Sequence, residues 1–159
     1  MKNIYKNSYK NIKKAKKILN KNNIIAVPTE TVYGLAGNAY SDSAVKRIYK
    51  IKNRPKKNPL IIHYYNIKNL RKDVFIDNKF LKLYKEFSPG PLTYILKKKE
   101  DTEISSHANS NLNSIAVRFP KNPLTGPTNP GLFHILTLNP RGIDINSGLN
   151  SKPEISFSS

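Results

Sequence analysis

The sequence predicts a single domain of the α/β (α+β) class. Its length of 159 residues is that of one typical domain and suffices to bury a core. Short apolar segments rich in β-branched residues alternate with segments whose apolar residues recur every three to four positions, the pattern of strands alternating with helices. The longest apolar runs have four or five residues, far fewer than the about 20 needed to cross a bilayer, so no membrane-spanning helix is expected.

The first predicted element is an amphipathic helix within residues 1–23. This segment has eight Lys and no acidic residue, and we interpret the Lys as a solvated face. It lacks the continuous apolar stretch of a secretory signal, so a cytoplasmic protein is expected. The apolar and aromatic positions with helical spacing are Tyr5, Tyr9, Ile12, Ala15, Ile18 and Leu19.

A buried strand is predicted at residues 24–27, ended by Pro28. The following helix begins at the potential capping residues 41–43 and ends before Pro55. A second strand is predicted at residues 60–63. The face that this helix is expected to bury consists of Ala44, Val45, Ile48, Tyr49 and Ile51.

The second half of the chain continues the alternation and then loses it. The pattern predicts mostly helix over 66–87, a rigid turn at Ser88-Pro89-Gly90-Pro91, strands at 92–96 and 114–119, and a loop between these strands. Repeated Pro and Gly interrupt the chain beyond Lys121, where only residues 132–138 favour a strand. The Ser-rich segment 151–159 is expected to be frayed.

The net charge of +18 and the pI near 10.1 suggest a polyanionic partner such as RNA or nucleotide phosphates. However, 23 of the 28 basic residues are Lys, which has A/T-rich codons. The excess can therefore reflect base composition as well as function, and both readings stay open.

Several kinds of chemistry are excluded or unsupported by motif. The absence of Cys excludes a disulfide framework, a Cys-ligated zinc and a thiol nucleophile. Neither a Walker-type phosphate loop nor a G-x-G-x-x-G sequence is present. His63, His107 and His134 lack metal-ligand spacing, so no protein-bound metal is predicted.

Polar residues instead gather where predicted elements end. Thr29, Glu30 and Thr31 follow the first strand, at the end where open α/β sheets bind ligands. Lys52 and Arg54 flank one residue before a proline and, in an extended segment, would project from one side as a phosphate clamp. Each feature has an ordinary alternative, such as a polar turn or a solvated basic loop.

His63 and Arg118 are each the single polar residue at the end of an apolar strand. A lone His is most often structural. An Arg in such a strand usually needs an anionic partner, which is either a protein carboxylate or a ligand.

Four ordered blocks resemble the YrdC/TsaC family of threonylcarbamoyl-AMP synthases. The first is Pro28-Thr29-Glu30-Thr31-Val32-Tyr33-Gly34-Leu35. The second is Lys52-Asn53-Arg54-Pro55 followed by Asn58-Pro59-Leu60-Ile61-Ile62-His63. The third and fourth are Ser88-Pro89-Gly90-Pro91-Leu92-Thr93 and Ile115-Ala116-Val117-Arg118-Phe119-Pro120. Together they span roughly residues 15 to 123, which makes the set far more specific than any one block.

The resemblance implies a single YrdC-like domain over residues 1–159, of the short standalone form. Its fold would be a twisted mixed β-sheet flanked by helices, with an open basic cleft. Its activity would be the formation of threonylcarbamoyl-adenylate and pyrophosphate from L-threonine, bicarbonate and ATP with Mg²⁺. The product would feed modification of tRNA adenosine 37, with transfer by a TsaD-type complex.

The family's site residues carry over by position. Thr31 and His63 match positions that contact threonine, and Arg118 matches the position that holds its carboxylate. The nucleotide-binding positions are matched by Lys52, Arg54, Asn58 and Ser114. Lys52 and Arg54, with Mg²⁺, would supply the charge that catalysis requires, since the reaction depends on alignment and charge neutralisation.

Beyond Pro120 the resemblance breaks. Counting back from Gly148, the Ser and Asn of the family's nucleotide loop fall on Ile143 and Ile145. Three explanations stay open: residues 121–159 are divergent, with Asn146 and Ser147 serving instead; the reading frame is damaged; or catalysis is lost. In the last case the chain would be an inactive relative that binds double-stranded RNA or tRNA.

Overall fold

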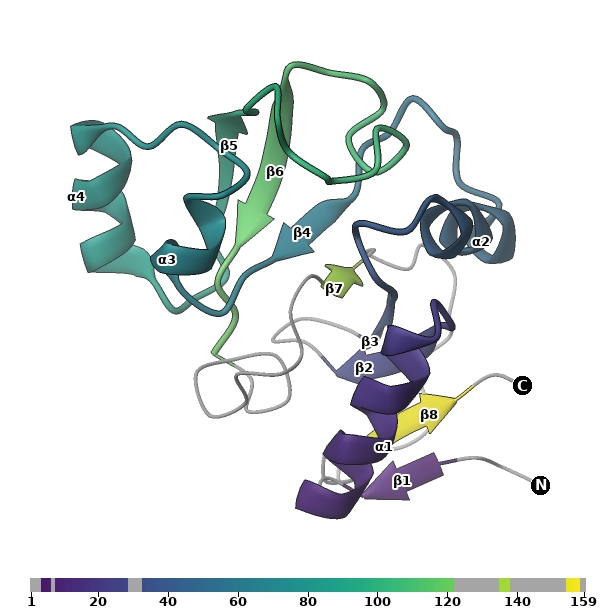
Figure 1. Ribbon diagram of the computed structural model, residues 1–159. Helices are drawn as coiled ribbons and strands as arrows, with labels where there is room; N and C mark the ends of the chain where they lie inside the picture. The colour runs from purple at the N-terminus through teal and green to yellow at the C-terminus, as the bar shows by residue number, and fades with distance from the viewer. Residues whose placement is uncertain (1–3, 7, 29–32, 122–134, 138–153, 158–159) are drawn as a thin grey trace.

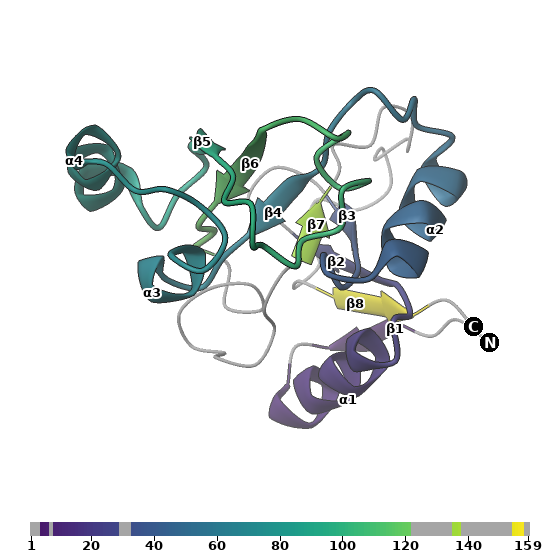
Figure 2. The ribbon, with the colours of Figure 1, turned by 45° about the horizontal axis from the view of Figure 1, so that its top comes forward.

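The computed structural model describes residues 4–6, 8–28, 33–121, 135–137 and 154–157, and shows two four-stranded sheets with helices packed against them (Figure 1). This agrees with the predicted mixed α/β class. Within the described residues the two sheets are not hydrogen-bonded to each other, and they meet where β3 (Tyr33–Ala36) lies beside β7 (Ile135–Thr137) (Figure 2).

The first sheet is antiparallel in the order β1-β8-β2-β3. Its strands are β1 (Ile4–Lys6), β2 (Ile25–Pro28), β3 (Tyr33–Ala36) and β8 (Glu154–Phe157). The helix α1 (Tyr9–Asn20) covers this sheet and buries Ala15 and Leu19 with residues of β2 and β3.

The second sheet has the order β5-β6-β4-β7. Its strands are β4 (Ile61–His63), β5 (Thr93–Lys97), β6 (Ser114–Arg118) and β7 (Ile135–Thr137). Strands β4 and β6 are parallel, whereas β5 and β7 run antiparallel to their neighbours. The sheet is therefore mixed, as predicted.

Four helices connect the strands within the described residues, namely α1, α2 (Asp42–Lys52), α3 (Ile67–Leu70) and α4 (Asn78–Phe87). Each begins at a polar cap whose side-chain oxygen accepts a hydrogen bond from the backbone N–H three residues on, which satisfies an otherwise unpaired donor. These caps are Ser8, Ser41, Asn66 and Asp77. None of the helices in the described part of the chain is long and apolar enough to span a membrane.

The main core lies between the second sheet and helices α2 and α4. Phe119 is its aromatic centre, since its ring packs edge-on against Tyr84 and Tyr94 at centroid distances of 4.7 and 6.2 Å. Aromatic residues bury large apolar areas, so this group fixes the position of β6 in the sheet.

Several local predictions were wrong. Tyr5 lies in strand β1 and not in the first helix, which starts after Ser8. Ile51 is 52% exposed, because it lies about 90° around the helix from the centre of the buried arc of α2. The predicted helical region 66–87 is two helices, separated by a segment in which Phe75 donates to the carbonyl of Lys97.

The two ends of the chain also differ from prediction. Residues 154–157 are not frayed but form β8, which pairs with both β1 and β2. The backbone groups of two neighbouring strands provide partners that composition alone does not reveal. The strand predicted within 132–138 is confirmed at residues 135–137.

Candidate functional site

Three polar residues form one row across the second sheet. His63 on β4 is paired with Arg118 on β6, and Arg118 is paired with Thr93 on β5. His63 and Arg118 are the last residues of parallel strands, so both lie at the carboxyl edge of the sheet. Ligands of open α/β sheets bind beyond this edge.

Arg118 is half-buried and held by a hydroxyl group. Its Nε and one terminal nitrogen both donate to the Thr93 Oγ1, at 3.1 and 2.8 Å. Among the described residues no carboxylate forms an ion pair with Arg118. A half-buried guanidinium held this way can accept a ligand carboxylate, the anionic partner that the sequence suggested.

His63 lies next to this cation and is only 2% exposed. Burial, followed by the charge of Arg118, lowers the pKa of His63 to about 3. The imidazole is therefore neutral at neutral pH. A neutral imidazole beside a guanidinium can hydrogen-bond a bound ligand without adding a second positive charge.

The segment that contains Lys52 and Arg54 is not extended. The expectation that both side chains project from one side of an extended segment is therefore wrong. Lys52 is the last residue of α2, and Asn53 closes the helix in a left-handed conformation at φ 45°. The Arg54 side chain folds over its own loop, donating from Nε to the carbonyl of Asn58 at 3.1 Å and from a terminal nitrogen to that of Pro59 at 3.0 Å. Arg54 thus braces the loop that leads into β4.

Ser114 lies at the opposite end of β6 from Arg118. Four steps along the strand, of about 3.3 Å each, place them about 13 Å apart. The nucleotide-binding residues predicted from the sequence, at Arg54, Asn58 and Ser114, therefore lie towards the starts of β4 and β6. The predicted threonine contacts His63 and Arg118 lie at the ends of these strands, so the structure forms two groups and not one.

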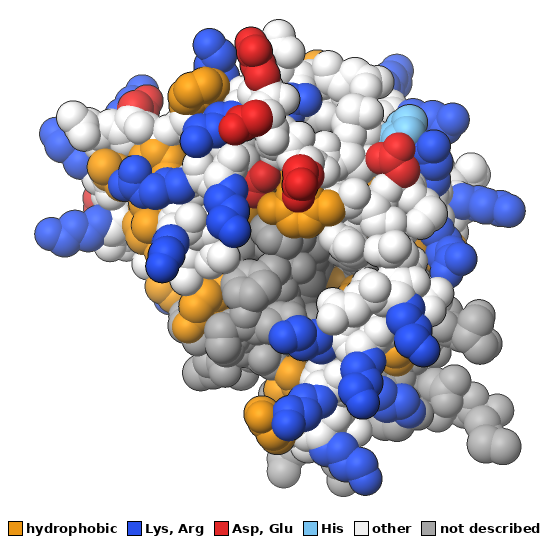
Figure 3. Space-filling view, in the orientation of Figure 1, with side chains coloured by type: hydrophobic (Ala, Val, Ile, Leu, Met, Phe, Trp, Pro, Cys, Tyr) orange, Lys and Arg blue, Asp and Glu red, His pale blue; other side chains and the backbone are white. Residues whose placement is uncertain are grey.

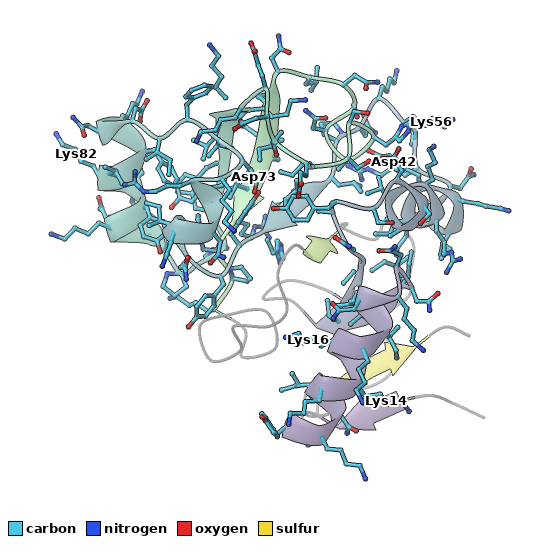
Figure 4. The ribbon with its side chains drawn as sticks, viewed as in Figure 1. Lys14, Lys16, Asp42, Lys56, Asp73 and Lys82 are labelled. Atoms are coloured by element: carbon cyan, nitrogen blue, oxygen red, sulfur yellow. The ribbon has the colours of Figure 1, made fainter. Side chains whose placement is uncertain are left out.

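Beside the Arg54 loop the surface is hollowed, with a volume of about 670 Å³. The hollow is lined by the basic residues Lys46, Lys50, Arg54, Lys56 and Lys57, with Tyr49, His107, Ser110 and Asn111. Figure 4 labels Lys56 and Asp42 on this side of the molecule. Lys52, Asn58 and Ser114 are not part of this lining, and the predicted open basic cleft stays a prediction.

Some predicted residues lie outside the described part of the chain. These are Thr31 and the tail positions Ile143, Ile145, Asn146 and Ser147. Within the described residues, no three His, Cys, Asp or Glu side chains gather as a metal site.

Sequence reasoning missed the role of Thr93. It belongs to one of the four blocks, but only the register of β5 against β6 shows that its hydroxyl holds Arg118. No feature of the local sequence links residues 93 and 118, since the pairing joins distant parts of the chain.

Comparison with known proteins agrees with the four blocks. The model of the Sua5, YciO and YrdC proteins, described as "Telomere recombination", matches residues 17–127. The threonylcarbamoyl-AMP synthase of Bacillus subtilis is 44% identical over 115 residues, covering 71% of this chain and 33% of that protein. That of Pyrococcus abyssi is 43% identical over 100 residues, covering 61% of this chain and 28% of that protein.

Solved structures give the same result. The structure of P. abyssi Sua5 complexed with L-threonine matches with a TM-score of 0.74 at 36% identity, covering 80% of this chain and 38% of that one. Escherichia coli YciO matches with a TM-score of 0.72 at 25% identity, covering 84% of this chain and 65% of that one.

This chain spans about a third of the length of the two synthases named above. The shared part contains the row of Thr93, Arg118 and His63, as well as the Arg54 loop. The family match extends over well more than half of the chain, and the fold of two solved members agrees with it. The chain therefore belongs to the Sua5/YciO/YrdC family.

Proposed function

We propose that the protein is a threonylcarbamoyl-AMP synthase, which forms threonylcarbamoyl-adenylate and pyrophosphate from L-threonine, bicarbonate and ATP. The observation that carries the proposal is the pairing of His63 with Arg118 at the carboxyl ends of parallel strands, in a chain of this family. A related Sua5 structure is complexed with L-threonine.

At the threonine end, Arg118 would bind the amino-acid carboxylate. Thr93 already occupies Nε and one terminal nitrogen of the guanidinium, which fixes its plane and leaves further N–H groups for a ligand. The neutral His63 would contact the polar part of threonine, together with Thr31. A planar guanidinium fits a carboxylate by two parallel hydrogen bonds, which sets the orientation of the amino acid.

The chemistry needs alignment more than acid-base groups. The threonine amine and bicarbonate combine to a carbamate with loss of water. A carbamate oxygen then forms a bond to the α-phosphorus of ATP, and the bond from this phosphorus to the bridging oxygen of the β-phosphate breaks, releasing pyrophosphate. Charge accumulates on the leaving phosphates, and cations held nearby stabilise it.

At the nucleotide end we propose Lys52, Arg54, Asn58 and Ser114 as ATP contacts, with Lys52 and Arg54 as the catalytic cations. Mg²⁺ would arrive with ATP. Because Arg54, Asn58 and Ser114 lie towards the starts of β4 and β6, bound ATP would have to extend along these strands to bring its α-phosphorus to the threonine end.

Further partners follow from the same proposal. The adenylate is a reactive mixed anhydride, so a TsaD-type complex would take it up and transfer its acyl group to tRNA adenosine 37. We also propose that residues 1–159 form one domain of this type, including the divergent segment 121–159.

The direct test measures pyrophosphate release from ATP while threonine and bicarbonate are omitted in turn. We expect release only when both are present, and Arg118→Lys is expected to raise the KM for threonine about tenfold, the effect of one lost charged hydrogen bond. The matched control is Arg71→Lys, at an exposed arginine after α3. Release without threonine, or no release from a folded sample, contradicts the proposal.

A second candidate is an inactive relative that binds double-stranded RNA or tRNA. It is favoured by the exposed Lys residues of α1, which Figure 3 shows as a basic surface and which are Lys10, Lys13, Lys14, Lys16 and Lys17. This candidate predicts tRNA affinity that falls steeply with salt, and no affinity for ATP. Calorimetric ATP binding that strengthens with threonine would contradict it.

A further inference from the structure

Asp73, labelled in Figure 4, is a buried carboxylate on the segment after α3, and it accepts a hydrogen bond from Tyr64, the residue that follows His63. It is 2% exposed and accepts three hydrogen bonds from hydroxyl groups. Tyr40 and Tyr64 donate to its Oδ2, each at 2.8 Å, and Thr102 donates to its Oδ1 at 2.5 Å. Burying a carboxylate costs free energy unless hydrogen bonds satisfy its oxygens. The three hydroxyl donors must therefore keep a defined position around Asp73.

The hydroxyl groups remain protonated donors. Burial, followed by the charge of Asp73, raises the pKa of both Tyr40 and Tyr64 above its usual value. Each tyrosine therefore keeps its proton, and both hydroxyl groups donate to the carboxylate of Asp73.

The network joins four separate segments. Asp73 follows α3, Tyr40 lies between β3 and α2, Tyr64 follows β4, and Thr102 lies in the loop between β5 and β6. The backbone of Asp73 is held as well, because its carbonyl accepts from the N–H of Lys99 at 2.9 Å. The carboxylate is thus a fixed point and not a mobile side chain.

Tyr64 connects this fixed point to the row at the carboxyl edge. It directly follows His63, and its backbone N–H donates to the carbonyl of Arg118 at 3.0 Å. Its ring also packs near Phe119, with a centroid distance of 6.4 Å. A displacement of Tyr64 would therefore shift His63 and release the carbonyl of Arg118.

We propose that Asp73 is a positioning residue for the threonine site, because through Tyr64 it fixes the end of β4 and so holds His63 against Arg118. Among the described residues, the carboxylate of Asp73 bonds to Tyr40, Tyr64 and Thr102 and not to His63 or Arg118 themselves. The effect of Asp73 on threonine binding rests on the proposed function, whereas its effect on the end of β4 beside β6 does not.

The first test uses Tyr64→Phe, which removes the donated hydroxyl and keeps the ring. The readout is hydrogen exchange of the Tyr64 amide by NMR. We expect exchange to accelerate at least tenfold at this amide while the amides of the β5–β6 ladder keep their protection. Unchanged exchange of the amide at position 64 would overturn the proposal. An equal rise at all protected amides would overturn it as well, because it would mean a loss of overall stability and not a local effect.

The second test measures kinetic constants of the same variant. We expect the KM for threonine to rise about tenfold and the KM for ATP to change less than twofold. The conservative Asp73→Asn, which retains one acceptor oxygen, is expected to lie between Tyr64→Phe and the wild type. A KM for threonine that does not move would overturn the link to substrate.

The matched control is Tyr94→Phe. Tyr94 is a buried tyrosine of the same sheet whose hydroxyl contacts Ser88 and the carbonyl of Leu83, away from Asp73. It should leave Tyr64 exchange and the KM for threonine unchanged, and matching effects in both variants would overturn the proposal. If the wild type releases no pyrophosphate, the proposed function fails, while amide exchange still decides the role of Asp73.

Discussion

Arg118 lies between His63 on one side and Thr93 on the other, each directly opposite it in a neighbouring strand. The guanidinium thus has a neutral, buried imidazole on one flank and a hydroxyl that accepts two of its hydrogen bonds on the other. Its positive charge is held in place without being neutralised by these neighbours.

Thr93→Val should weaken threonine binding, because the isosteric change removes the oxygen that orients Arg118. We expect a five- to tenfold rise in the KM for threonine, about 1 kcal/mol, with little change for ATP. Steady-state kinetics would measure it. Thr93→Ser keeps the hydroxyl and is the control; if Ser and Val behave alike, the hydroxyl is not what positions Arg118.

His63 should make stability depend on pH. Its pKa in the folded state, about 3, lies below the usual value of 6.5, so the unfolded chain binds the extra proton and the folded chain does not. This contribution is complete above pH 6.5 and is lost as the pH falls towards 3. Between pH 7 and pH 5 the loss is about 2 kcal/mol.

Urea unfolding of the wild type and of His63→Gln at pH 7 and pH 5 would measure this effect. The variant should be less stable at pH 7 but lose less of its stability between the two values. His107→Gln, at a side chain that is 39% exposed, serves as the comparison. An equal pH dependence in wild type and His63→Gln would show that His63 does not carry it.

Gly90 should not tolerate a side chain. A Cβ at this position would lie 2.6 Å from the carbonyl oxygen of Phe87, which is backbone and cannot move away easily. We expect Gly90→Ala to destabilise the protein by about 2 kcal/mol in thermal or urea unfolding. At Gly37 the nearest atom is the flexible Cδ1 of Ile48, at 3.1 Å, so Gly37→Ala should cost less. The opposite order would contradict this explanation.

Replacement of Arg54 and replacement of Lys52 should differ in their effect on stability. Arg54→Ala removes the brace on the carbonyls of Asn58 and Pro59 and should lower stability by about 1 kcal/mol as well as abolish pyrophosphate release. Lys52→Ala should abolish release with unchanged thermal stability. Lys50→Ala, at an exposed neighbour on α2, is the control. Normal turnover in both variants would exclude them from the site.

Local signals in the sequence predicted those elements whose boundaries have a local cause. Ser41 and the proline at position 55 bracket α2, because capping and the steric demand of proline act within a few residues. The strand predicted at 114–119, ahead of Pro120, is confirmed at 114–118. By contrast, the apolar spacing continues through Tyr5 and does not reveal that the helix starts after Ser8. Strands β1 and β8 depend on each other as partners.

The candidate site was predictable to a similar extent. His63 and Arg118 could be selected as single polar residues ending apolar strands, and the structure pairs them. Thr93 and Asp73 could not, because their roles depend on strand register and on hydroxyl groups 9 to 33 residues away along the chain. Such contacts arise only when the whole sheet is assembled.

Strand β8 lies between β1 and β2, so residues 154–157 fill a place between two segments from the first part of the chain. On the ribosome, β1 and β2 emerge long before β8 is synthesised. The first sheet therefore cannot close as the chain grows, and its central place stays open until residue 157 has left the exit tunnel. Pairing over such sequence distances is slow, so we expect α1 and the β2–β3 hairpin to stay partly exposed until β8 pairs with β1 and β2.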